Sequence, residues 1–157
     1  MLRLISRVLA VGFLSFAGAS QAQVVISQVY GAGGNTGATY NRDFVELFNR
    51  GASPVALGGL TVQYSSATGT GNFSVGATLP AVNLSPGQYY LVGMSSGANG
   101  APLPTVDVSG TSAMATAAGK VVLVNSTTAL ACNGGSTPCS APQLALIVDL
   151  VGYGTAN

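Results

Sequence analysis

Apolar segments recur along the chain from residue 24 onward, and their patterns predict β-strands. Residues 60–65 alternate, with Leu, Val and Tyr on one face and Thr, Gln and Ser on the other, which is typical of a half-buried strand. Residues 120–125 and 144–153 are continuous apolar runs of the kind that interior strands carry. Further strand-like segments, rich in β-branched and aromatic residues, are residues 24–31, 43–49 and 88–94. A helical period is confined to a short piece near residues 142–146.

Segments of small residues lie between these predicted strands, and we interpret them as inter-strand loops. They are rich in Gly, Ala, Ser, Thr and Pro and cover residues 31–41, 66–80 and 95–104. Pro86 and Gly87, just before one predicted strand, suit the central pair of a type II turn. Several short strands separated by such turns predict an all-β fold, either an antiparallel sandwich or a barrel.

The first 22 residues have the pattern of an export signal. Arg3 and Arg7 precede an uncharged apolar run, and Ser20 and Ala22 occupy the positions that a signal peptidase requires. The run is too short for a membrane anchor, which needs about 20 residues. We therefore predict cleavage after Ala22 and secretion, with a periplasmic location if the source is Gram-negative. No transmembrane segment is predicted in the mature chain, residues 23–157.

The mature chain carries very few charges, and four of them gather in and directly beside one predicted strand. Removal of residues 1–22 takes away two of the five cations, leaving three cations, four acids and a net charge of −1. The gathered charges are Arg42, Asp43, Glu46 and Arg50. Asp43 and Glu46 are an odd number of residues apart and therefore point to opposite faces of a strand. This parity counts against a cation site and favours a structural cluster that fixes register, with the two arginines as candidate partners.

Cys132 and Cys139 bracket a loop that contains Gly and Pro. In an exported chain this arrangement predicts one local disulfide. The alternative is a redox or metal-binding pair. It is less well supported, because the spacing is not C-x-x-C and the chain has no His.

The inventory of residues argues against catalysis and cofactor binding. Without His, neither a Ser-His-Asp nor a Cys-His arrangement can be built, and a zinc hydrolase lacks its ligands. Two-metal hydrolysis needs clustered carboxylates, and the chain has four: Asp43, Glu46, Asp107 and Asp149. The Gly-rich residues 31–41 lack the spacing of a phosphate-binding loop and precede a strand. Three cations are too few for autonomous nucleic-acid binding. We predict no catalytic residue, no metal site and no cofactor.

The order of several segments resembles the lamin-tail domain, in the bacterial form found on exported proteins. The segments are VVISQVYG (residues 24–31), a Gly-rich loop, DFVELFNRG (43–51), VALGGL (55–60) and LSPGQYYLV (84–92). The resemblance covers about residues 24–153. It implies an immunoglobulin-like β-sandwich with no catalytic residues of its own, often placed beside a secreted nuclease, phosphatase or other hydrolase, or repeated on surface proteins. One departure is Leu60, where the family often has an aromatic residue, commonly Trp.

Two functions remain open for this lamin-tail-like domain, residues 23–157. The first is a non-catalytic targeting or scaffold module in the N-terminal part of a secreted hydrolase of nuclease or phosphatase type. The second is a free-standing secreted surface or matrix protein that acts by protein association. Because the sequence stops just after an apolar segment, we expect a domain cut short at its C-terminus and lacking its last strand. The alternative is a complete small protein whose last strand is residues 145–153. Neither hypothesis identifies the protein or cell-surface partner.

Overall fold

A computed structural model describes residues 23–69 and 71–157, and the predicted export signal, residues 1–22, lies outside the described residues. Strands dominate the described part of the chain. In chain order the elements are β1 (Val24–Tyr30), β2 (Arg42–Asn49), β3 (Val55–Ala56), β4 (Thr61–Ser66), β5 (Ser74–Thr78), β6 (Asn83–Leu84), β7 (Tyr89–Ser96), β8 (Val108–Ser109), β9 (Gly119–Val124), α1 (Ala141–Leu144) and β10 (Ile147–Tyr153). The short helical piece expected near residues 142–146 corresponds to α1.

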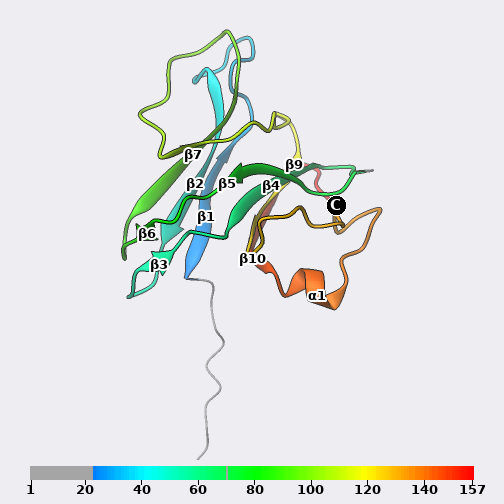
Figure 1. The fold of residues 1–157 in the computed structure, drawn as a ribbon. Helices are drawn as coiled ribbons and strands as arrows, with labels where there is room; N and C mark the ends of the chain where they lie inside the picture. The colour runs from blue at the N-terminus through cyan, green and yellow to red at the C-terminus, as the bar shows by residue number, and fades with distance from the viewer. Residues whose placement is uncertain (1–22, 70) are drawn as a thin grey trace, which may run out of the picture.

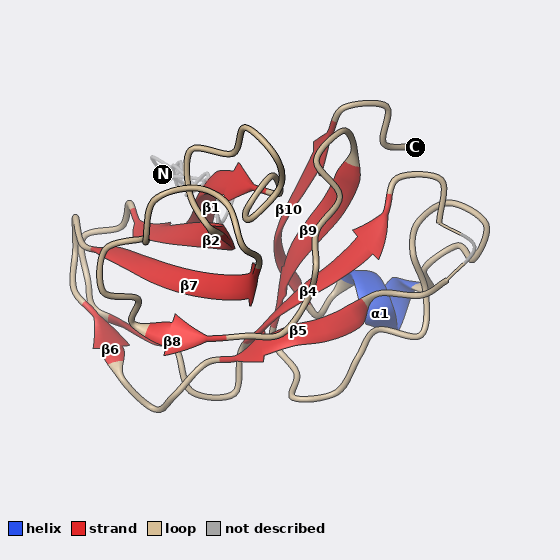
Figure 2. Cartoon of the chain, turned by 90° about the horizontal axis from the view of Figure 1, so that it is seen from above, coloured by secondary structure: helices blue, strands red, loops and turns tan. Residues whose placement is uncertain are grey.

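The strands form two packed sheets. The first has the order β1-β2-β7-β8 and the second the order β10-β9-β4-β5, while β3 and β6 make a small separate pair. Strand pairing is antiparallel throughout these sheets except between β7 and β8. Figure 1 shows β7, β2 and β1 on one side of the molecule and β4, β9 and β10 on the other. Figure 2 shows the same two groups from above, with α1 beside the second. The prediction of an all-β sandwich is confirmed.

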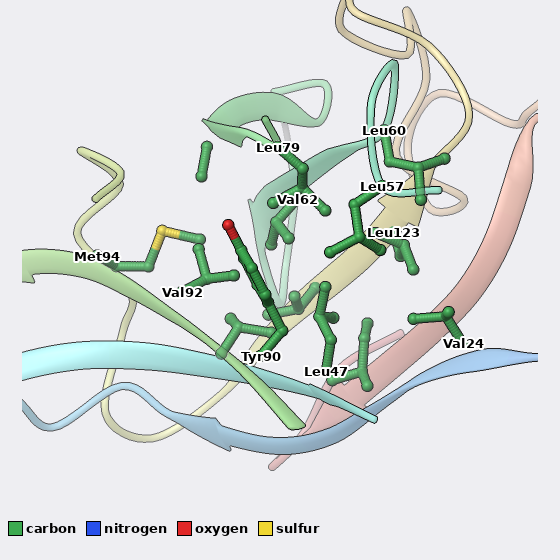
Figure 3. Close-up of a cluster of buried hydrophobic side chains, with 14 of the residues drawn as sticks. Val24, Leu47, Leu57, Leu60, Val62, Leu79, Tyr90, Val92, Met94 and Leu123 are labelled. Carbon is green, nitrogen blue, oxygen red and sulfur yellow. The ribbon is translucent and has the colours of Figure 1, made fainter. Parts of the chain in front are cut away.

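The main core lies between the two sheets and follows from the alternation of side chains along each strand. Leu47 of β2 and Val92 of β7 point inward from the first sheet, and Val62 of β4 and Leu123 of β9 point inward from the second (Figure 3). All four side chains are fully buried. At about 25 cal/mol per Å² of apolar surface, each such side chain contributes about 1.5–3 kcal/mol. Burial of this alternating set fixes which face of each strand turns outward.

A second, smaller cluster explains the continuous apolar run of β9. Val121 and Leu123 face the main core, whereas Val122 and Val124 face the other way and pack with Phe73. The outer face of the second sheet is covered there by the segment that carries the disulfide and α1. Both faces of β9 are therefore buried, as the continuous apolar pattern predicts.

The interpretation of residues 66–80 as a loop is wrong in part, because they contain β5. This strand pairs with β4, although three residues of its sequence, Ser-Val-Gly-Ala-Thr, are small ones that are less common in strands. Ala77 packs in the main core, and a Cβ on Gly76 would lie 2.9 Å from Ser112 Oγ. Small residues are required here because neighbouring chain segments approach closely. The other two predicted loops, residues 31–41 and 95–104, run side by side through isolated bridges.

Candidate functional site

Asp43 is the most deeply buried member of the charged group in β2. It lies where the pairing of β2 with β7 is irregular, and its carboxylate turns inward, with 4% of the residue exposed. The carboxylate accepts backbone N–H bonds from Gly33 at 2.7 Å and from Met114 at 2.8 Å. Burial raises the pKa of this carboxyl above its ordinary value, and the two N–H bonds oppose that rise. Asp43 therefore ties two loops to β2.

The close approach of these loops explains one glycine in the Gly-rich segment. A Cβ on Gly33 would lie 2.0 Å from the carbonyl carbon of Arg42 and 2.1 Å from the nitrogen of Asp43. No side chain fits in that space, so only glycine lets its N–H reach the Asp43 carboxylate. The Gly-rich segment is thus packed against β2, which is a structural use of its small residues.

Two tyrosines complete this buried region from the second sheet. The Tyr153 hydroxyl of β10 donates to the Ala115 carbonyl at 2.6 Å, and the Tyr64 hydroxyl of β4 accepts the Ala115 N–H at 3.0 Å. Burial raises the pKa of the Tyr153 phenol well above its ordinary value, with Tyr64 and the nearby Asp43 charge adding to the rise. Asp43 and both tyrosines therefore anchor the segment around Ala115 between the sheets.

The other charges of β2 lie in different places. The Arg42 guanidinium donates to the Met94 carbonyl at 2.6 Å and to the Gly93 carbonyl at 3.2 Å, so it binds backbone rather than a carboxylate. Glu46 lies on the outer face of the sheet, where it accepts the Ser27 hydroxyl at 2.7 Å. Arg50 is exposed beyond the end of the strand. The structure does not bring these four charges together into one cation site.

The remaining acids also accept backbone N–H bonds. Asp107 accepts the Leu91 N–H at 2.7 Å and holds the segment before β8 against β7. Asp149 of β10 accepts the Ile26 N–H at 2.7 Å, where the ladder between β1 and β2 is irregular, and so joins the edges of the two sheets. Within residues 23–69 and 71–157, no group of three or more His, Cys, Asp or Glu side chains is placed to hold a metal ion.

The predicted disulfide is formed. Cys132 and Cys139 are joined, with a Cα–Cα distance of 5.1 Å. Cys132 is fully buried against Val122 and Val124, so the bridge fixes the segment that covers the outer face of the second sheet. Its place in a packed cluster supports a structural rather than a redox role.

The outer face of the first sheet carries an aromatic surface, which the sequence pattern of a single strand does not predict. Phe48 and Tyr89 are cross-strand partners with ring centroids 4.6 Å apart, and Tyr89 is 61% exposed. Beside Tyr89 lies a groove of about 350 Å³ whose lining includes Gln88, Asn83 and Asp107. The alternation of side chains along β2 places Phe48 on the face opposite to Leu47, and the register between β2 and β7 places it against Tyr89. We call Phe48, Tyr89 and this groove the aromatic surface.

Comparison with protein-family models matches residues 17–153 to the Lamin Tail Domain. The chain belongs to this family. Comparison with curated proteins found no match. The resemblance drawn from the order of the sequence segments is therefore confirmed.

Two of the segments that carry the resemblance to the Lamin Tail Domain, residues 43–51 and 84–92, are neighbours in space. They become β2 and β7, which pair along the middle of the first sheet from Phe44–Gly93 to Phe48–Tyr89. Leu60, which departs from the family pattern, is 7% exposed and packs in the main core. Residue 60 of this Lamin Tail Domain therefore belongs to the core and not to an exposed surface. In the part of the chain that the structure describes, no helix is long and apolar enough to cross a membrane.

Proposed function

We propose that this Lamin Tail Domain is a non-catalytic module of an exported protein and acts by association. The supporting observation is the different placement of its acidic and aromatic side chains. Asp43, Asp107 and Asp149 each accept a backbone N–H and hold segments of the fold together. General acid–base catalysis needs titratable groups that converge on a bound substrate. These carboxylates are bound to different segments of the fold, and Asp107 alone of the three lines the groove beside Tyr89. The exposed Tyr89 ring is directed outward instead.

The aromatic surface is the contact region that we assign to this association. Tyrosine is enriched among the residues that dominate binding energy, because its ring offers a large rigid area and its hydroxyl a hydrogen bond. Asp107 is the one charged residue in the lining of the groove, beside the amides of Asn83 and Gln88. A partner that fits is a protein segment with apolar and neutral polar groups. Its binding would depend little on salt, since few charges take part.

The wider context that we propose is a secreted hydrolase of nuclease or phosphatase type, in which this module targets or positions the catalytic part. Support comes from the predicted export signal, from the disulfide and from what the family resemblance implies for bacterial members. The module itself would supply no catalytic group. Its removal would then change where the hydrolase acts and leave the chemistry at its active site unchanged.

The purified chain should be assayed with chromogenic phosphate monoesters and diesters in the presence of Mg²⁺, Ca²⁺ or Mn²⁺. We expect no turnover above that of buffer. Turnover that disappears in the Asp43→Asn variant would contradict a non-catalytic role. Catalysis and association are tested separately, because the second is measured by binding to cells of the source organism.

For association, the Tyr89→Ser variant should bind those cells at least about tenfold more weakly than the wild type, as expected for loss of an aromatic anchor. Leu146→Ser is the matched control, since Leu146 is an exposed apolar residue, 36% accessible, just after the short helix and away from the aromatic surface. Equal binding by wild type and Tyr89→Ser would exclude the aromatic surface as the contact region.

A further inference from the structure

Lys120 is a buried cation that holds the covering segment of the second sheet. It lies on β9 in line with Val122 and Val124, so its side chain leaves the outer face of the sheet and runs beneath the disulfide-closed segment. Only 3% of the residue is exposed. The two other cations among residues 23–157 are less buried: Arg42 is partly exposed and Arg50 is exposed.

In the part of the chain that the structure describes, the Lys120 ammonium is bound by neutral oxygen atoms alone. Its Nζ donates to the Asn133 carbonyl at 2.7 Å and to the Asn157 side-chain carbonyl at 2.8 Å. An ammonium has three N–H donors, so one remains for a further acceptor. Lys120 makes no ion pair with a carboxylate of residues 23–69 or 71–157. A cation buried without a counter-charge carries a desolvation cost that a bound anion would offset.

A cavity of about 190 Å³ opens beside this ammonium. Its polar end is formed by Lys120 and its two acceptor residues, Asn133 and Asn157. The rest of the lining is mainly apolar. Phe73 is buried, Ile147 is partly buried, and Leu144 and Leu150 are about half exposed. At ~30 Å³ for each water molecule, the space holds about six waters or an organic group of similar size.

We infer that this cavity binds a carboxylate at the end of an apolar chain, with about six carbon atoms in all. The carboxylate accepts the third N–H of Lys120 and neutralises the buried charge, in a charge-assisted bond that is stronger than the present neutral ones. The apolar chain packs on Leu144, Ile147 and Leu150 and removes their apolar surface from water. A phosphate group fits less well, because it carries more charge and needs more donors than one lysine offers. The site is independent of the aromatic surface, which lies on the other sheet.

The test uses hexanoate as the probe and methyl NMR spectroscopy of the complete chain at constant ionic strength. Hexanoate should give saturable shifts of the methyl signals of Leu144, Ile147 and Leu150. 1-Hexanol has the same number of carbon atoms without the charge, and acetate has the charge without the apolar chain. Each should bind about tenfold more weakly than hexanoate, because each lacks one of the two contacts.

The Lys120→Met variant keeps an unbranched side chain that is one heavy atom shorter and removes the charge, and it should lose the preference for hexanoate over 1-hexanol. Arg50→Met is the matched control, since it removes one positive charge at an exposed position away from the cavity and should bind hexanoate as the wild type does. Equal affinity of the wild type for hexanoate and 1-hexanol would overturn the inference without any variant. Absence of saturable shifts at the methyl groups of these three residues would also overturn it, including the case in which an acidic group of the protein itself fills the cavity.

Discussion

Replacement of Asp43 by Asn isolates the effect of one buried carboxylate on stability. The carboxylate accepts two backbone N–H bonds, from Gly33 and Met114. The amide can accept one of them, but its NH₂ group then faces the other donor and leaves it unsatisfied. A buried N–H without a partner costs about 1–3 kcal/mol, and removal of the buried charge offsets part of that cost. We expect Asp43→Asn to lower the free energy of unfolding by about 2 kcal/mol.

Urea unfolding monitored by circular dichroism measures this difference, and the slope of the transition shows whether the variant still unfolds in one step. For a domain of this size the melting temperature should fall by roughly 5–10 °C. Glu46→Gln is the matched control in the same strand, because Glu46 is partly exposed and accepts a bond from the Ser27 hydroxyl. We expect a change of less than about 0.5 kcal/mol there. Equal effects of the two substitutions would refute the assignment of Asp43 as a buried anchor.

The pH dependence tests the same residue with a defined sign. Burial raises the pKa of Asp43 in the folded state above its value of 3.8 in the unfolded chain. The folded state therefore takes up a proton first as pH falls, and between the two pKa values it holds more protons than the unfolded state. The Asp43 contribution to stability thus increases as pH falls through the folded pKa towards 3.8, and it is lost as pH rises. Asp43→Asn should remove this component, and an unchanged pH profile would contradict the raised pKa.

Three further results are expected. Reduction of the Cys132–Cys139 bond should lower stability by about 2–3 kcal/mol, measured by unfolding with and without reductant, and no shift would mean that the bridge constrains nothing. Gly33→Ala should cost at least about 2 kcal/mol because its Cβ would overlap the backbone of Arg42, whereas Gly71→Ala, with no atom within 4 Å of its Cβ, serves as the near-neutral control in the same thermal melts. Chelation of divalent metals should leave the melting temperature unchanged, and a clear drop would restore the cation-site hypothesis for β2.

The charged residues show which features of the candidate site can be predicted from local sequence and which cannot. Strand parity was enough to separate Asp43 from Glu46, and the structure places the first inward and the second on the outer face. Strand parity could not identify the hydrogen-bond partners of the buried acids. The Met114 N–H lies 71 residues from Asp43 along the chain, and the Ile26 N–H lies 123 residues from Asp149. Such contacts depend on how loops cross between the sheets. Arg42 illustrates the same limit, since its place beside the strand makes it a candidate partner for a carboxylate, whereas its guanidinium binds carbonyl groups of β7.

The sequence by itself determined the all-β class, the interior position of β9 and the local disulfide. Each follows from information within a few residues: alternation, a continuous apolar run, or two cysteines around a turn. The tertiary structure alone decided that the small-residue segment around Gly76 forms a strand, that Phe48 stacks on Tyr89, and that Lys120 is buried beside an apolar cavity. These features arise from strand register and from the packing of distant segments. The free energy that selects them comes from contacts between residues far apart in the chain, which no local pattern records.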